Sequence, residues 1–348
     1  MSVFRGLIRW CAVLMIVGAA AGCGGGGGDG GSTPPPPVTP PSKIFVGDSG
    51  IEPAIGSSPN SNPSPGQVVV ERIISGPNTM LSSALVDFAL DVARDRLYVA
   101  DLRSILVFDN ISTADGDIAP SRVVFTCCAG VGNYVGIYLD TVNDRLYAAA
   151  NVNLPPNGQV IHVFDNVSTL SNSAPNRVIA VDPTVLMDVA VDTTRNILYV
   201  YGRGAVSTLT EIAVFDGAAT LSGPATANRT ISIDESFSSG PAVGMFIDPA
   251  NNRLYAPRFG PGQVMVFDNA SMKNGAVNAA AAPERAINLP VPTLTNITVD
   301  LAANRLYALD TDGLNIIDNA STVTGTPPIV VRVLAPGGST FKAVAVKP

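Results

Sequence analysis

Apolar and polar positions repeat along the chain from residue 43 onward. Five segments share one pattern: an apolar strand ending in Asp, a short polar turn, and a second strand that starts Arg-Leu-Tyr or a close variant. They are Asp91–Tyr98, Asp140–Tyr147, Asp192–Tyr199, Asp248–Tyr255 and Asp300–Tyr307. Their tyrosines are 49, 52, 56 and 52 residues apart. Such a period indicates a repeat architecture.

Each repeat contains two further strands. A third strand ends in an apolar residue followed by Asp, at Asp109, Asp165, Asp216, Asp268 and Asp318. A fourth begins with Arg before apolar residues, at Arg72, Arg122, Arg177, Arg229, Arg285 and Arg332. Four short strands separated by turn residues are typical of a propeller blade, and six arginines in register define six blades. We therefore predict an all-β, six-bladed β-propeller of four-stranded blades over residues 43–348.

The two ends of this region complement each other. Residues 343–346 match a first strand, and residues 43–46 match a second strand. We expect the C-terminal strand to join the N-terminal blade and close the ring, which leaves no strand edge open at the seam. That blade is the least regular, because Pro53 interrupts its third strand.

Residues 1–22 have the features of an export signal. Arg5 and Arg9 precede a short apolar run at 11–17, and small residues at 20–22 stand directly before Cys23. This arrangement resembles the bacterial lipobox, although Ala20 replaces the usual Leu. The resemblance implies cleavage before Cys23 and lipidation of its thiol; the alternative is an ordinary cleaved signal that leaves a free thiol. Residues 23–42 then form a Gly- and Pro-rich tether.

These features predict a lipoprotein of the bacterial cell envelope, attached to the membrane through its lipid. Residue 24 is Gly and not Asp, which favours the outer membrane, on its periplasmic or its surface side. Without the signal the chain has 19 Lys and Arg (21 − 2) against 28 Asp and Glu, a net charge of −9. A sparsely charged, acidic chain argues against nucleic acid as a partner. A protein, a glycan or a small molecule remains open as the ligand.

The repeats resemble a group of propellers that includes NHL repeats, YVTN-type surface repeats and lactonase-like propellers. Val189–Asp192, Leu97–Asp101 and Ile105–Asp109 carry the resemblance. It spans residues 43–348 and implies an architecture, not an activity. The only tryptophan, Trp10, lies in the signal, so blades docked by tryptophan are disfavoured.

Strand direction assigns the repeated charges to one rim of the propeller. Asp91, Arg96, Asp109, Arg122 and their counterparts share this rim, named here the Asp–Arg rim. They form either a charged binding ring or pairs across adjacent strands that fix the hairpins. We favour the pairs, because the same residues recur in every blade. The opposite rim varies from blade to blade, with long loops at 151–158, 202–208 and 234–244.

One position beside the axis on this opposite rim alternates in chemistry. Four residues before each first-strand Asp stand Asp87, Gly136, Asp188, Gly244, Asn296 and Ala343. Asp87, Asp188 and Asn296 offer hard oxygen ligands of the kind that Ca²⁺ takes. The resemblance to lactonase-like propellers also implies a metal near this place. The alternative is ordinary turn chemistry, since Asp, Asn and Gly are common before strands.

Two other features bear on function. Cys127 and Cys128 form either a vicinal disulfide, in an oxidising envelope, or a pair of small buried side chains. His162, the only histidine, lies in a third strand, where packing or a surface position is favoured over catalysis. A single histidine excludes a histidine-cluster hydrolase, and no Gly-x-Ser-x-Gly motif is present.

We assign no catalytic residue from the sequence. The leading hypothesis is an envelope-anchored, non-catalytic binding or scaffolding propeller. One alternative is a Ca²⁺-dependent, lactonase- or esterase-like hydrolase in which Asp87, Asp188 and Asn296 hold the ion. Another is a surface adhesion module displayed on the tether.

Overall fold

The computed structural model describes residues 42–59, 70–126, 132–152, 159–204, 209–236, 244–258, 262–291, 294–310, 313–329, 331–334 and 341–348. These residues belong to one compact unit, Pro41–Pro348, which is separate from Met1–Pro40. No helix among the described residues is both long and apolar enough to span a bilayer.

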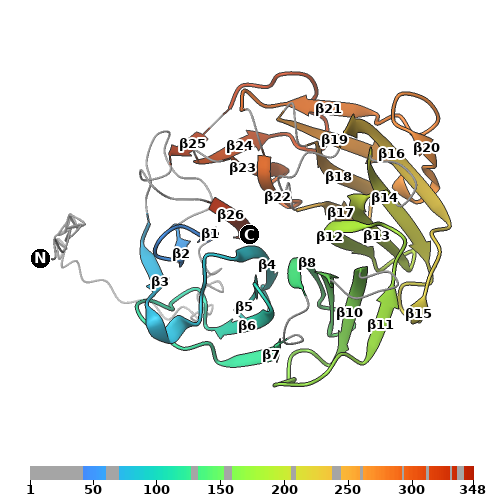
Figure 1. The fold of residues 1–348 in the computed structure, drawn as a ribbon. Coiled ribbons are helices and arrows are strands. Elements are labelled where there is room, and N and C mark those ends of the chain that lie inside the picture. Colours follow the sequence, from blue (N-terminus) through green and yellow to red (C-terminus); the bar gives the residue numbers. More distant parts are fainter. Residues whose placement is uncertain are drawn as a thin grey trace, which may run out of the picture. The chain divides into compact units, whose positions relative to one another are not determined.

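Six antiparallel sheets form the blades, each with its first strand innermost (Figure 1). Blade 1 is β26 (Phe341–Lys347), β1 (Lys43–Asp48), β2 (Ala54–Ser57) and β3 (Arg72–Ser75), and blade 2 is β4 (Leu85–Asp91), β5 (Arg96–Asp101), β6 (Ser104–Asp109) and β7 (Arg122–Thr126). Blade 3 is β8 (Asn133–Asp140), β9 (Arg145–Asn151), β10 (Gln159–Asp165) and β11 (Arg177–Ala180), and blade 4 is β12 (Val185–Asp192), β13 (Ile197–Arg203), β14 (Leu209–Asp216) and β16 (Arg229–Ser236). Blade 5 is β17 (Phe246–Asp248), β18 (Arg253–Arg258), β19 (Gln263–Asp268) and β21 (Arg285–Asn288), and blade 6 is β22 (Leu294–Asp300), β23 (Arg305–Asp310), β24 (Gly313–Asp318) and β25 (Val331–Leu334).

The ring closes as the two chain ends predict. β26 pairs with β1 from Lys43 opposite Lys347 to Asp48 opposite Phe341. The innermost strands contact one another in the order β26, β4, β8, β12, β17, β22 and back to β26. Two short 3-10 helices, η1 (Pro77–Thr79) and η2 (Ala270–Met272), lie in connections between strands.

Two sheets are larger than the predicted four strands. β15 (Gly223–Pro224) comes from the third-to-fourth-strand connection of blade 4 and pairs in parallel with β11 of blade 3. β20 (Gly275–Ala276) of blade 5 pairs in the same way with β16 of blade 4. Isolated bridges join Ile74 to Gly116 and Ile287 to Gly325 at the same place in other blades. The connection of one blade thus covers the outer edge of the preceding blade, which protects an otherwise open strand.

The recurring Asn and Asp residues are explained by backbone geometry. The residue before the second strand has a left-handed conformation in blades 2 to 6: Asp95, Asp144, Asn196, Asn252 and Asn304 have φ between 50° and 58°. Asn and Asp adopt this conformation more readily than other non-glycine residues. The tight turn therefore requires the residue types that mark each repeat.

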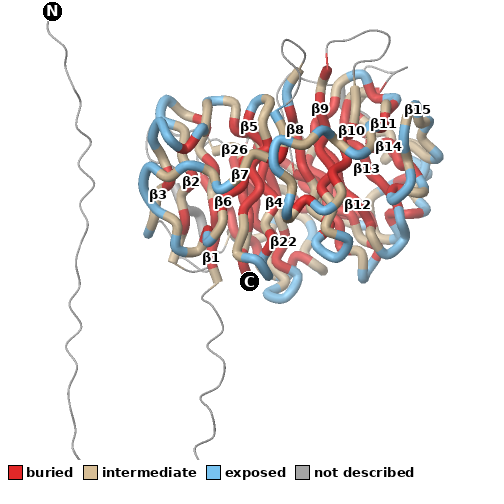
Figure 2. The backbone as a smooth tube through the Cα atoms, turned by 90° about the horizontal axis from the view of Figure 1, so that it is seen from below, coloured by how far each residue is buried: buried red, intermediate tan, exposed pale blue. Residues whose placement is uncertain are grey.

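The hydrophobic core consists of six clusters, one between each pair of neighbouring blades. Tyr98, Tyr147, Tyr199, Tyr255 and Tyr307, the repeated tyrosines, are all at most 1% exposed. Because both faces of every sheet are covered, the inner strands are mostly buried, and exposed residues lie at the two rims and along the outer edge (Figure 2). The fold therefore leaves the rims and the axis as the places where a site can form.

Candidate functional site on the propeller axis

A β-bulge recurs near the start of the innermost strands. The register shifts between Leu85 and Asp87, Tyr134 and Gly136, Leu186 and Asp188, Leu294 and Asn296, and at Lys342 opposite the Gly47–Asp48 step. The residue directly after each bulge is the alternating position that the sequence singles out. Bulges re-aim the side chains that follow them. This repeated device positions the polar side chains near the axis.

Asp87, Asp188 and Asn296, named here the axial cluster, are 5%, 2% and 1% exposed. Each contacts the innermost strand of the next blade. Oδ2 of Asp87 accepts a hydrogen bond from the Ile137 amide at 2.8 Å, and Oδ2 of Asp188 accepts one from the Met245 amide. Nδ2 of Asn296 donates to the Lys342 carbonyl at 3.1 Å. These hydrogen bonds between side chain and backbone therefore join three alternate blades to their neighbours.

The turn interpretation of these residues is wrong. All three lie within strands, β4, β12 and β22, and their side chains bond to a neighbouring blade and not to a local turn. The sequence could not distinguish the two cases, because the bulge that re-aims the side chains depends on pairing with the second strand.

The structure brings the cluster together across the axis. Nδ2 of Asn296 in blade 6 also donates to Oδ1 of Asp87 in blade 2, at 3.2 Å. Blades 3 and 5 leave room for this contact, because they carry glycine at the equivalent position. A Cβ at Gly136 would lie 2.2 Å from Oδ1 of Asp188, and a Cβ at Gly244 would lie 2.4 Å from Oδ1 of Asn296. Glycine alternates with the oxygen-bearing residues because the axis cannot hold a side chain from every blade.

Burial and mutual repulsion dominate the electrostatics of the cluster. Burial raises the pKa of Asp87 to about 6, although hydrogen bonds from Ile137 and Asn296 oppose the shift. Burial, together with the charge of Asp87, raises the pKa of Asp188 well above its usual range. Two neighbouring buried carboxyls that resist ionising together either retain a proton or attract a cation.

One oxygen of the cluster lacks a partner. Oδ1 of Asp188 is buried and makes no well-formed hydrogen bond with the described part of the chain, although the Val189 and Gly244 amides favour the charged carboxylate. An unsatisfied buried carboxylate oxygen in a native protein calls for a bound proton, water, ion or ligand group. Asp188 and Asp87 therefore fit a hard cation in part. Asn296 directs its Nδ2 toward Asp87, so its amide would have to rotate to offer oxygen. No group of three His, Cys, Asp or Glu suited to a metal occurs among the described residues.

The Asp–Arg rim is largely occupied by structural ion pairs, as expected. The second-strand arginine pairs with the third-strand aspartate in four blades: Arg96–Asp109, Arg145–Asp165, Arg253–Asp268 and Arg305–Asp318. In blade 4, Ile197 replaces that arginine, and Asp216 pairs with Arg229 instead.

Four of the fourth-strand arginines, unlike Arg229, have a role that the sequence did not indicate. Arg122 donates to the carbonyls of Val167 and Leu170, and Arg177 to those of Ala218 and Leu221, in each case in the next blade. Arg72 and Arg285 make the same kind of contact. These arginines join blades to one another and do not fix their own hairpins.

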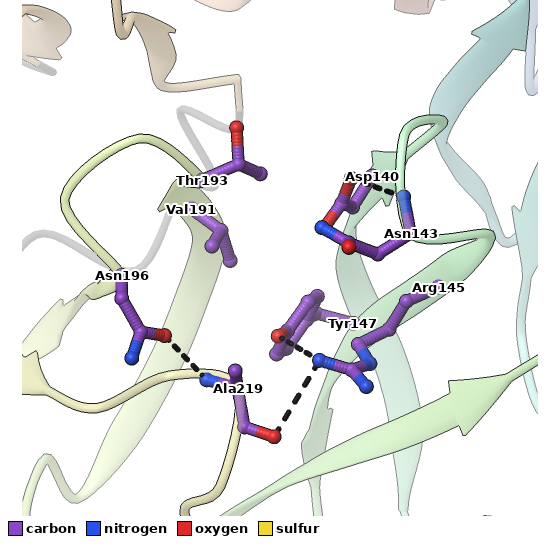
Figure 3. Close-up of a pocket in the computed structure, with 8 residues that line it drawn as sticks. All are labelled: Asp140, Asn143, Arg145, Tyr147, Val191, Thr193, Asn196 and Ala219. Carbon is purple, nitrogen blue, oxygen red and sulfur yellow. Dashed lines mark hydrogen bonds between the residues drawn. The ribbon is translucent and has the colours of Figure 1, made fainter.

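A depression of about 320 Å³ opens on the Asp–Arg rim between blades 3 and 4 (Figure 3). Its lining consists of Asp140, Asn143, Arg145, Tyr147, Val191, Thr193, Asn196 and Ala219. Nη1 of Arg145 lies 3.5 Å from both the Tyr147 hydroxyl and the Ala219 carbonyl, and Asn196 accepts from the Ala219 amide at 2.7 Å. No feature singled out in the sequence marked this hollow, and most of the functional groups that line it are hydrogen-bonded to one another.

His162 has the packing role that its position predicts. It is 6% exposed, its Nδ1 lies 3.0 Å from the Tyr134 hydroxyl, and its ring contacts Phe125 and Phe164 edge-on. Burial lowers the pKa of the imidazole to about 4. Cys23, Cys127 and Cys128 lie outside the described residues, as do most residues of the long loops on the opposite rim.

Comparison with known proteins supports the fold alone. No protein-family model matches the chain, and no curated protein matches its sequence. Among solved structures 888 chains match, so the architecture is too widespread to indicate an activity. One is a propeller chain in the crystal structure of a nidogen/laminin complex, with a TM-score of 0.58 and 12% identity. The match covers 88% of this chain and 98% of that chain.

Proposed function

We propose that this protein is an envelope-anchored, non-catalytic binding propeller, lipidated at Cys23, that receives a cation or a cationic ligand group at the axial cluster. The unpartnered, buried Oδ1 of Asp188 carries the proposal. The repeated charges of the other rim are mostly engaged in ion pairs, whereas the axis departs from the repeat and holds an unsatisfied acceptor. The nidogen match involves a protein crystallised in complex with a partner, which is compatible with a binding role.

Cation binding is tested by thermal melting of the full chain with Ca²⁺, with Mg²⁺ and with a chelator. A ligand that binds only the folded state raises the melting temperature. We expect Ca²⁺ to raise it, and Asp188→Asn to abolish the increase. Asp300→Asn is the matched control: Asp300 is also buried on an innermost strand but lies at the Asp–Arg rim. A melting temperature that neither cation nor chelator changes would contradict a metal at the axis.

The same residues support a second candidate, a Ca²⁺-dependent lactonase- or esterase-like hydrolase. A cation beside Asp188 and Asp87 would polarise a carbonyl or activate water. The observation that favours it is again the free oxygen of Asp188. Turnover of lactones that is lost on chelation and in Asp188→Asn, but kept in Asp300→Asn, would support the hydrolase over the binding propeller.

The anchor has its own test. Mass spectrometry of the protein extracted from cell membranes is expected to find a diacylglyceryl group on Cys23. Cys23→Ser is expected to release the chain into the soluble fraction, because one such anchor supplies most of the membrane affinity. Membrane retention of the Cys23→Ser chain without lipid would contradict lipid anchoring.

A further inference from the structure

The chain enters the propeller at the Asp–Arg rim. Lys43, the first residue of β1, pairs with Lys347 at the end of β26, and β26 ends at the same rim as the other innermost strands. Figure 2 shows the C-terminus at this edge of the ring. Whatever is attached upstream of residue 42 is therefore joined to the Asp–Arg rim and not to the rim near the axial cluster.

Five turns surround the axis on this rim, at 92–95, 141–144, 193–196, 249–252 and 301–304; we name them the turn crown. The crown exposes apolar side chains: Val92, Val142 and Leu301 are 43%, 86% and 47% exposed. Each directly follows, or lies close behind, the aspartate that ends an innermost strand. Exposed apolar residues gathered on one face indicate an interaction surface.

The exposed charges of the crown are positive. Arg94 and Arg195 are exposed, while their partners Asp91 and Asp192 are 2% and 0% exposed. The crown's other carboxylates, Asp95 and Asp144, are half-buried and hydrogen-bonded to Ser112 and Ser168. Asp95 also pairs with Lys347. The crown thus presents exposed apolar side chains together with two exposed guanidiniums, each of which is paired with a buried carboxylate.

We infer that the turn crown rests on the surface of the membrane that holds the lipid anchor. This inference rests on the proposed lipidation of Cys23. The tether has 19 residues (24–42), so its average reach is about 25 Å. Innermost strands of 7 and 8 residues, such as β4 and β8, span roughly the same distance. Facing the membrane with the opposite rim would require the tether to cross the height of the molecule, whereas the crown lies beside the point of entry.

This orientation has a consequence for the proposed site. Val92, Val142 and Leu301 enter the headgroup layer, and Arg94 and Arg195 lie against lipid phosphates. The axial cluster lies toward the other end of the innermost strands, so this orientation places it on the side away from the membrane.

A single tryptophan tests the inference directly, because the processed chain has none once Trp10 is removed with the signal. Val142→Trp places the reporter in the crown, and Ile51→Trp is the matched control. Ile51 is 99% exposed in the β1–β2 turn of the opposite rim. The lipidated chains are reconstituted into phosphatidylcholine vesicles, with and without phosphatidylglycerol, that contain brominated lipid as quencher.

We expect a several-fold greater loss of fluorescence in the V142W chain than in the I51W chain, and a larger loss when phosphatidylglycerol is present. Arg94→Gln with Arg195→Gln should remove the dependence on phosphatidylglycerol. Equal quenching at both positions, or none at either, would overturn the inference. If V142W does not fold, Leu301→Trp with Leu102→Trp as its control replaces the pair. Mass spectrometry of the peptide that contains Cys23 is a separate measurement, and it shows whether the lipidation proposal itself has failed.

Discussion

At the scale of single residues, the axial cluster combines hydrogen bonds that favour its charge with burial that disfavours it. Asp87 and Asp188 each accept a hydrogen bond from a backbone amide of the next blade, yet burial raises the pKa of both carboxyls. A hydrogen-bonded acid that is hard to ionise contributes to the architecture at low pH and opposes it at high pH. This conflict makes pH the most direct probe of the cluster.

The stability of the propeller should fall as pH rises through the cluster's titration. The folded state holds the Asp87 proton up to a pKa of about 6, whereas the unfolded chain releases it near 3.8. Between these values the folded state binds more protons, so the free energy of unfolding decreases with pH, by about 3 kcal/mol for this group. We expect Asp188→Asn to melt higher than the parent at pH 8 and to differ less at pH 5. Asp300→Asn, measured in the same way, should keep the parent's pH dependence.

Gly136 should not tolerate a methyl group. A Cβ there would lie 2.2 Å from Oδ1 and 2.8 Å from Cα of Asp188, and the Cα belongs to a paired strand that cannot move freely. Gly136→Ala is therefore expected to lower the free energy of unfolding by about 1–3 kcal/mol. Gly56→Ala is the control, because its Cβ would meet nothing closer than 3.5 Å. Equal denaturant midpoints for the two variants would contradict the crowding argument.

At the scale of elements, blades are joined by their fourth strands as well as by the core. The guanidinium of Arg177 in β11 reaches the carbonyls of Ala218 and Leu221 in the turn that follows β14. These contacts come from a position that the repeat pattern marks only as the start of a strand. The sequence identified the residue correctly, but its partner depends on how neighbouring blades stack.

Arg177→Ala should destabilise the propeller by about 1–3 kcal/mol, since it leaves two carbonyls without a charged donor. Arg177→Lys should recover only part of this loss, because an ammonium cannot reproduce the planar fork. Arg94→Ala removes an ion pair whose guanidinium lies in solvent, and it should cost less than Arg177→Ala. Chemical denaturation of the three variants distinguishes a bond between blades from a surface ion pair.

At the scale of the whole molecule, closure of the ring combines several contacts in one strand. β26 pairs with β1, supplies the Lys342 carbonyl to Asn296, and places Ala343, Val344 and Ala345 in the clusters on both sides of blade 1. Lys347 adds an ion pair to Asp95 in blade 2. The seam is thus joined by backbone, polar and apolar contacts together.

Deleting residues 341–348 should therefore prevent folding of the ring and not simply weaken one blade. Loss of β26 exposes one edge of β1 and opens two hydrophobic clusters, which favours aggregation. Deleting Pro348 alone is the control. A soluble shortened chain with the parent's cooperative melt, followed by circular dichroism, would show that closure is not required.

The sequence by itself determined the architecture and the identity of the polar residues near the axis. The period of about 52 residues, the Asn and Asp turns and the complementary chain ends follow from local chemistry, which each repeat carries within its own residues. It also placed the Asp–Arg rim and the axial position at opposite ends of the strands, since strand direction alone decides this.

Only the tertiary structure decided what those residues touch. The bulge that turns Asp87, Asp188 and Asn296 toward the next blade, the space left by Gly136 and Gly244, and the reach of Arg177 into blade 4 all depend on distances between blades. The same holds for the hollow between blades 3 and 4 and for the turn crown. Such distances result from the packing of whole sheets around an axis, which no single repeat encodes.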